Sequence, residues 1–175
     1  MLILAIIIVI IAVVLLFAAT KPDTFQLHRS IRISAPPERI FPLINDFHQW
    51  QSWSPWENID PTMIRTFEGT PEGLGTIYSW AGQGKVGSGR MEITLSNPFD
   101  QIIIQLDFLK PFEAHNIAEF SIVNLGDSTE VTWEMRGPSP FIAKVMGLFF
   151  NMDRVVGKDF ETGLANIKAI VEKTS

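Results

Sequence analysis

Short segments of alternating apolar and polar residues fill the middle of the chain. Met91, Ile93 and Leu95 alternate with polar side chains, as do Val131 and Trp133 further on. This period of two is typical of strands with one buried and one solvated face. With the glycine, proline and asparagine breaks, it predicts strands at about 25–34, 62–68, 75–81, 88–95, 101–109, 115–124 and 129–137. The last six are joined by connections too short for parallel crossovers, so we expect a curved antiparallel sheet of about seven strands.

The last third of the chain carries apolar residues at helical spacing. They recur every three or four residues between Ser139 and about Lys173, which places them on one face of an α-helix. The stripe consists of Val145, Phe149, Met152, Val156, Phe160, Leu164, Ile167 and Val171. Ser139 is expected to cap this helix and Pro140 to take its first position. Because Asp153 can cap a second helix, a break near 151–153 is the alternative to one continuous helix.

The first half of this helix is apolar on nearly all sides, whereas the second half has a polar back. A helix that is apolar all round needs cover on more than one side. The first half is therefore expected to be fully buried, to border a cavity or to contact a membrane.

The segment after the first strand combines helix starts with an aromatic cluster. Pro36 and Pro37 end the strand and begin a short helix to about Asn45, and a second short helix is expected from Asp46. Residues 47–56 then hold three of the five tryptophans. Such a cluster closes one end of a core, lines a ligand site or lies at a membrane interface.

The N-terminus is a candidate membrane helix. Leu2 to Ala19 are all apolar, and this length is close to that needed to span the hydrocarbon core. A secretory signal is the competing interpretation, but the charged start and a good cleavage site are missing. We therefore expect a transmembrane anchor at 1–20, a linker at 21–24 and a domain at 25–175. Four basic residues follow the anchor and favour a single-pass protein with a cytoplasmic domain, namely Lys21, Arg29, Arg32 and Arg39.

Composition excludes several classes of function. The net charge of −5 lacks the basic excess of a nucleic-acid binder, so we expect no nucleic-acid partner. Without cysteine there is no thiol nucleophile and no cysteine-ligated metal. His28, His48 and His115 do not have metal-ligand spacing, so the sequence predicts neither a metal site nor a cofactor.

No residue stands out as catalytic. Residues 82–87 match the letters of a dinucleotide-binding glycine motif, but a strand pattern follows where that motif needs a helix. A hairpin loop is the better interpretation. The candidate acids fall mainly on the outward side of their strands, where a solvated carboxylate is the norm; they are Glu92, Asp107, Glu119 and Glu134.

Several stretches resemble the SRPBCC superfamily, the helix-grip fold shared by START lipid-transfer domains and birch-pollen-allergen-like proteins. The similar stretches are 33–41, 50–56, 75–80, 87–91, 129–133 and 158–166. The chain is most similar to the polyketide cyclase/dehydrase-like branch, and the glycine-rich loop resembles that of the pollen-allergen branch. The resemblance implies an α+β fold in which the curved sheet wraps around the long C-terminal helix, with two short helices after the first strand.

The resemblance also implies a cavity between sheet and helix. The residues expected to line it are Trp53, Trp80, Met91, Ile93, Leu106, Phe108, Phe120, Trp133, Met146 and Phe149. The leading hypothesis is a membrane-anchored module that binds an apolar small molecule there, such as a lipid, a quinone or a polyketide-like compound. The alternatives are a cyclase- or dehydratase-like enzyme, and a non-catalytic interaction module of co-chaperone or stress-response type whose cavity is filled by its own aromatic rings.

Overall fold

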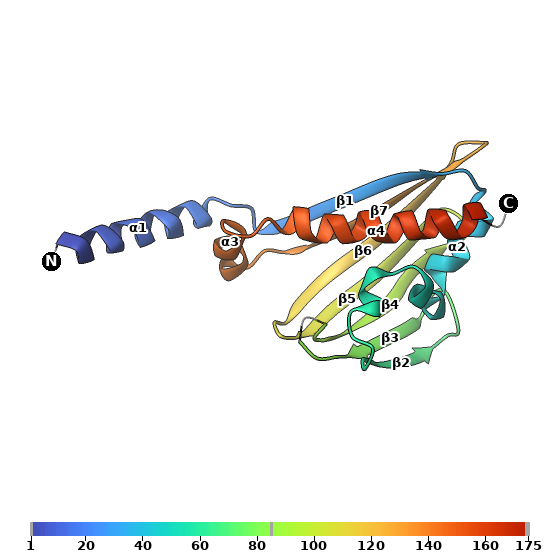
Figure 1. Ribbon diagram of the computed structural model, residues 1–175, viewed down its shortest axis with the longest axis horizontal. Helices are drawn as coiled ribbons and strands as arrows, with labels where there is room; N and C mark the ends of the chain where they lie inside the picture. The colour runs from blue at the N-terminus through green and yellow to red at the C-terminus, as the bar shows by residue number, and fades with distance from the viewer. Residues whose placement is uncertain (1, 85, 174–175) are drawn as a thin grey trace.

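A seven-stranded antiparallel sheet forms the body of the protein in the computed structural model, which describes residues 2–84 and 86–173 (Figure 1). Its strands are β1 (Thr24–Ile33), β2 (Ile64–Gly69), β3 (Thr76–Ala81), β4 (Ser88–Asn97), β5 (Gln101–Lys110), β6 (Ala114–Asn124) and β7 (Thr129–Pro138). They lie in the order β1-β7-β6-β5-β4-β3-β2. The predicted antiparallel sheet is confirmed, and each predicted strand lies within about two residues of an observed one.

The two faces of the sheet differ as the alternation predicts. On β6, Ala118, Phe120 and Ile122 are buried, whereas Glu119 between them points outward and pairs with Arg136 of β7. The register between β4 and β5 shifts near Ile93, which is a bulge-type irregularity. Bulges bend a strand and increase the local twist, which helps the sheet to curve around its apolar face.

The long helix α4 (Met152–Lys173) covers that apolar face along β1 and β7 (Figure 1). Phe160, Leu164, Ile167 and Val171 are its buried apolar side chains, and they follow the predicted stripe. Gly163 lets the helix come close to the sheet, because a Cβ atom there would lie 3.0 Å from the ring of Trp133. The C-terminal half of the predicted helix is therefore confirmed as the partner of the sheet.

The prediction of one continuous helix from Ser139 is wrong, and the alternative break is observed. A separate helix α3 (Phe141–Gly147) comes first, and α4 begins only at Met152. The predicted cap is also wrong, because Pro140 precedes α3 without a side-chain cap, while the Ser139 N–H donates to the carbonyl of Asp23. Asn151, rather than Asp153, caps α4 by accepting from the N–H of Arg154.

The reason for the break is that α3 packs on a different partner. Helix α1 (Leu2–Ala19) projects away from the sheet, and its last turn contacts α3 (Figure 1). Ala18 is the buried residue of α1. Of the described helices, α1 is the one long and apolar enough to cross a membrane. To reach α1, the chain has to leave the axis of α4.

Short helices cover the part of the sheet that α4 leaves open. Helix α2 (Pro37–Asn45) follows β1, and two 3₁₀ helices follow it, η1 (Phe47–Ser52) and η2 (Pro55–Asn58). The Asp46 carboxylate caps η1 by accepting from the N–H of His48. The prediction of short helices after the first strand is confirmed.

Candidate functional site

Aromatic rings fill the space between the sheet and the middle of α4. The ring of Trp133 on β7 stacks on Phe160 of α4, with centroids 4.0 Å apart and planes 3° from parallel. Phe120 stacks on the Trp133 ring at 4.8 Å, and Trp53 meets it edge-on at 5.5 Å. This part of the inner face is therefore packed by side chains of the protein itself.

The aromatic segment at 47–56 closes the core here. Trp50 and Trp53 are buried, and their indole N–H groups donate to the carbonyls of Ile44 and Leu43 at 3.0 and 2.8 Å. Both hydrogen bonds go back to helix α2, so they fix the two rings against the sheet. Core closure, the first of the three interpretations of this cluster, is what these contacts support.

Eight of the ten predicted cavity residues come together on the inner face. Five of them are buried, namely Trp53, Met91, Ile93, Phe120 and Trp133. The other three are half-buried, namely Trp80, Leu106 and Phe108. Met146 and Phe149 do not join them, because they are 46% and 69% exposed. The prediction that these two residues lie beneath the long helix is therefore wrong, because the helix breaks after α3 and this segment lies away from the sheet.

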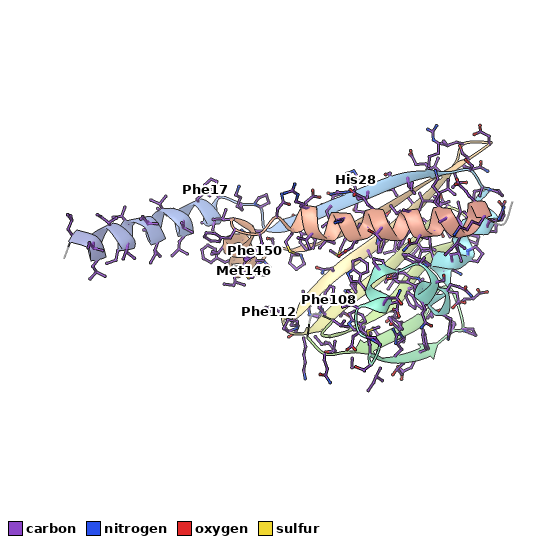
Figure 2. All side chains as sticks on the ribbon, in the orientation of Figure 1. Phe17, His28, Phe108, Phe112, Met146 and Phe150 are labelled. Carbon is purple, nitrogen blue, oxygen red and sulfur yellow. The ribbon has the colours of Figure 1, made fainter. Side chains whose placement is uncertain are left out.

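The half-buried residues mark a more accessible end of the inner face. Trp80 on β3 meets Phe108 on β5 edge-on, with centroids 5.8 Å apart. Gly89 lies between them, and a Cβ atom there would come within 2.4 Å of the Trp80 ring. Figure 2 shows Phe108 and the exposed Phe112 toward the end of the sheet from which α1 projects. The inner face is thus fully buried at its centre and more accessible to solvent toward α1.

Two buried polar atoms on the inner face have no hydrogen-bond partner among the described residues. One is Asn116 Oδ1, an acceptor, and the other is Trp133 Nε1, a donor. Asn116 is 5% exposed and shares the inward parity of Ala118 on β6. It lies against Gly137 of β7, where a Cβ atom would fall 2.1 Å from Asn116 Oδ1. Buried polar atoms are normally paired, so these two unpaired atoms are exceptions within an otherwise apolar interior.

Sequence reasoning missed Asn116. The signal was present, because an asparagine at an inward position of an alternating strand breaks an otherwise apolar face. It was hidden because His115 and Asn116 stand together at the start of β6, where the strand register is hard to fix from sequence alone.

A second buried polar group joins η2 to the edge of the sheet. The Glu57 carboxylate accepts hydrogen bonds from Tyr78 Oη at 2.6 Å and from Arg65 Nε at 2.7 Å. Burial raises the pKa of Tyr78, and the nearby Glu57 carboxylate raises it further. Because both carboxylate oxygens are engaged, this group acts as a brace between η2, β2 and β3 rather than as a free base.

The acids considered from the sequence are on the outer face or at the surface and are also paired. Glu119 and Glu134 both contact Arg136, while Asp107 contacts His115. Glu92 pairs with Arg90. Within the described residues, no group of three His, Asp or Glu side chains is arranged to hold a metal ion.

A charged surface cleft of about 470 Å³ lies where β1 meets the start of α4. Arg29 fills it by donating to Glu161 at 2.8 Å and to Asp153 at 3.0 Å. Hydrogen bonding to Arg29 holds the pKa of Asp153 below its usual value. Gly157 makes room for Arg29, since a Cβ atom there would lie 2.0 Å from the guanidinium. The ion pairs of Arg29 with Asp153 and Glu161 thus hold the first turns of α4 on β1.

The family model for polyketide cyclase / dehydrase and lipid transport matches residues 24–172. The chain belongs to this family. The predicted SRPBCC-type resemblance and helix-grip fold are thereby confirmed. No curated protein sequence matches the chain closely enough to count as a relative.

Solved structures share the fold of this family member at low sequence identity. A protein from Thermobifida fusca is 18% identical, with a TM-score of 0.64 over 85% of this chain and 93% of its own. The di-domain ARO/CYC StfQ of the steffimycin biosynthetic pathway is 11% identical, with a TM-score of 0.66 over 86% of this chain and 51% of its own. The Aha1 dimer from Colwellia psychrerythraea is 16% identical, with a TM-score of 0.56 over 85% of this chain and 96% of its own. At these identities the similarity establishes the fold alone.

Proposed function

We propose that this protein is a membrane-anchored module that binds an apolar small molecule on the inner face of its sheet. The observation that carries the proposal is the buried, unpaired Asn116 Oδ1, opposite the half-buried Leu106 on an apolar part of that face. An apolar pocket with one or two polar groups suits a lipid, a quinone or a polyketide-like compound. The family description, polyketide cyclase / dehydrase and lipid transport, supports a ligand of the lipid or polyketide-like class.

The anchor in this proposal is α1, followed by the linker and the ligand-binding domain. Its packing supports a retained helix rather than a cleaved signal, because Ala18 is buried against the rest of the protein. The next residues continue that contact, since Asp23 binds both Ser139 and Lys144 of the α3 region. The basic residues after the helix support a cytoplasmic domain.

Binding without catalysis is the form of this function that the contacts support. An acid or base catalyst needs a titratable group that can reach the ligand. On the inner side, the Glu57 carboxylate is held by Arg65 and Tyr78, and it stabilises the fold instead.

A filled interior is the observation that favours a second candidate, an interaction module. The stacked rings of Trp133, Phe160 and Phe120 occupy the centre of the space between the sheet and α4. In that case the surface, rather than the interior, would carry the function. The two candidates differ in one measurable property, the uptake of an apolar ligand.

Native mass spectrometry of the full chain tests the proposal. The protein is purified in detergent, freed of detergent by collisional activation and compared before and after organic extraction. We expect one apolar molecule per chain that survives activation and disappears on extraction. A chain that carries no such molecule, and takes none up from a total membrane lipid extract or a quinone, contradicts ligand binding and favours the interaction module.

Replacing Asn116 with leucine is expected to separate binding from stability. Removing an unpaired buried acceptor should raise the free energy of unfolding by about 1–3 kcal/mol. The same change should weaken binding of a pyrene-labelled fatty alcohol about tenfold, because its hydroxyl loses its acceptor, a difference of about 1.4 kcal/mol. Energy transfer from the interior tryptophans to pyrene measures the binding.

The matched control for this experiment is the probe without its hydroxyl. A pyrene-labelled alkane should bind the wild-type chain and Asn116→Leu equally well, since neither makes a hydrogen bond to it. Equal losses for the alcohol and the alkane would show that Asn116 shapes the pocket without recognising a polar group. Unchanged binding of both would place the ligand elsewhere.

A further inference from the structure

An unusual number of large apolar side chains are exposed where α3 turns into α4. Phe149, Phe150 and Ile142 are 69%, 63% and 66% exposed, and Phe141, Met146 and Met152 are also exposed. We call these six residues the apolar turn. Figure 2 shows Met146 and Phe150 at the end of the domain from which α1 projects, and α3 contacts α1. Single exposed apolar residues are normal on a soluble protein, but a cluster of this kind marks an interaction surface.

The position of the apolar turn relative to α1 indicates what covers it. The 18 residues of α1 rise about 27 Å at 1.5 Å per residue, close to the roughly 30 Å of a bilayer hydrocarbon core. When α1 spans the bilayer, Ala18 and Ala19 therefore lie at the boundary between lipid and water. Since Ala18 is the buried residue of α1, and α1 contacts α3, helix α3 lies at the same depth.

Polar contacts fix α3 at this depth. Lys144, whose side chain is buried, donates to Asp23 Oδ1 at 2.5 Å, and the Ser139 N–H donates to the Asp23 carbonyl at 2.6 Å. Both contacts tie the α3 region to the residues directly after α1. The apolar turn is thus tied to the residues after α1 through Ser139, which precedes it, and Lys144, which lies within it.

The charges around the apolar turn fit a membrane surface. Lys21 lies over the ring of Phe17, 4.5 Å from its centroid, and Arg154 is exposed in the first turn of α4. Aromatic rings with basic groups next to them are typical of the interfacial layer, where the rings meet acyl chains and the cations meet phosphates.

We propose that the apolar turn inserts into the interfacial layer of the bilayer leaflet next to the domain, as a second membrane contact beside α1. The inference rests on the proposed anchoring by α1 and deepens it. Two contacts fix the orientation of the domain, whereas one helix with a short linker would leave it free to rotate. The occupant of the apolar turn is lipid, and not a second copy of the chain.

The absence of cysteine makes the test direct, because any introduced cysteine is the single labelling site. The full chain is reconstituted into phosphatidylcholine–phosphatidylglycerol vesicles after Phe150→Cys, Leu16→Cys or Glu72→Cys, and each variant is labelled with the fluorophore NBD. Leu16 reports on α1, while Glu72 lies in the exposed β2–β3 connection and serves as the aqueous control. Quenching by doxyl-labelled lipid and by aqueous iodide is then compared.

We expect the label at position 150 to behave like that at position 16, with several-fold more lipid quenching and less iodide quenching than at position 72. If position 16 is in lipid but position 150 is quenched by iodide like position 72, α1 is an anchor and the apolar turn does not insert. If position 150 is shielded from iodide without lipid quenching, protein covers it, and the inference is overturned in favour of a second copy. If position 16 is quenched by iodide, the anchoring itself fails, and this inference fails with it.

Discussion

Replacing Phe160 with alanine is expected to lower the free energy of unfolding by about 3–5 kcal/mol, the usual range for a large aromatic side chain lost from a core. Phe160 is 1% exposed and stacks on Trp133, and it also meets Trp56 edge-on at 6.0 Å. Its removal leaves a cavity between α4 and the sheet that the rigid neighbouring rings cannot close. Urea unfolding of the full chain in detergent, followed by tryptophan fluorescence, measures the loss.

The matched control is Phe150→Ala, the same substitution in the segment between α3 and α4. Phe150 is 63% exposed, so its truncation opens no cavity in the domain and should change the free energy of unfolding by less than about 1 kcal/mol. Comparable losses for the two variants would mean that the Trp133–Phe160 stack does not hold α4 on the sheet.

The strands and helices whose apolar residues recur with a clear period could be predicted from the sequence. Val131 and Trp133 alternate with polar residues, and the structure places them on the buried face of β7. The stripe through Phe160 and Leu164 likewise becomes the buried side of α4. Such patterns succeed because the periods of strand and helix are local properties, and one buried face imposes them on the sequence.

The region of α3 shows where this reasoning stops. Periodicity reveals that Met146 and Phe149 belong to an apolar surface, but not which surface covers it. Packing on a sheet and insertion into lipid select the same side chains. The helix break at Leu148–Asn151 decides between them, and it depends on the contact of α3 with α1, which is distant in the sequence.

Parts of the candidate site were hidden for a related reason. Eight of the predicted inner-face residues lie there because each is apolar and at an inward position of its own element. Polar partners carry no such local mark: Glu57 and Tyr78 are 21 residues apart in the sequence and meet only after β3 is placed next to η2. Their pairing therefore had to come from the structure.

Replacing Glu57 with alanine is expected to lower the free energy of unfolding by about 3–5 kcal/mol, because removing one member of a buried ion pair leaves the other uncompensated. The Glu57 side chain is 7% exposed and that of Arg65 is 20% exposed. Arg65 would lose its carboxylate partner, and the buried Tyr78 hydroxyl would lose its acceptor. Both losses weaken the attachment of η2, and of the adjacent aromatic segment, to the edge of the sheet.

The matched control for Glu57→Ala is Glu92→Ala. Glu92 pairs with Arg90 at 2.7 Å, the same distance as that between Glu57 and Arg65, but both side chains of this pair are about one-third exposed. Solvent screening reduces such a pair to about 0–1 kcal/mol. Thermal and urea unfolding of the two variants in the same detergent measures the difference. Equal losses would show that burial does not distinguish the two pairs and that the Glu57 carboxylate does not act as a brace for η2.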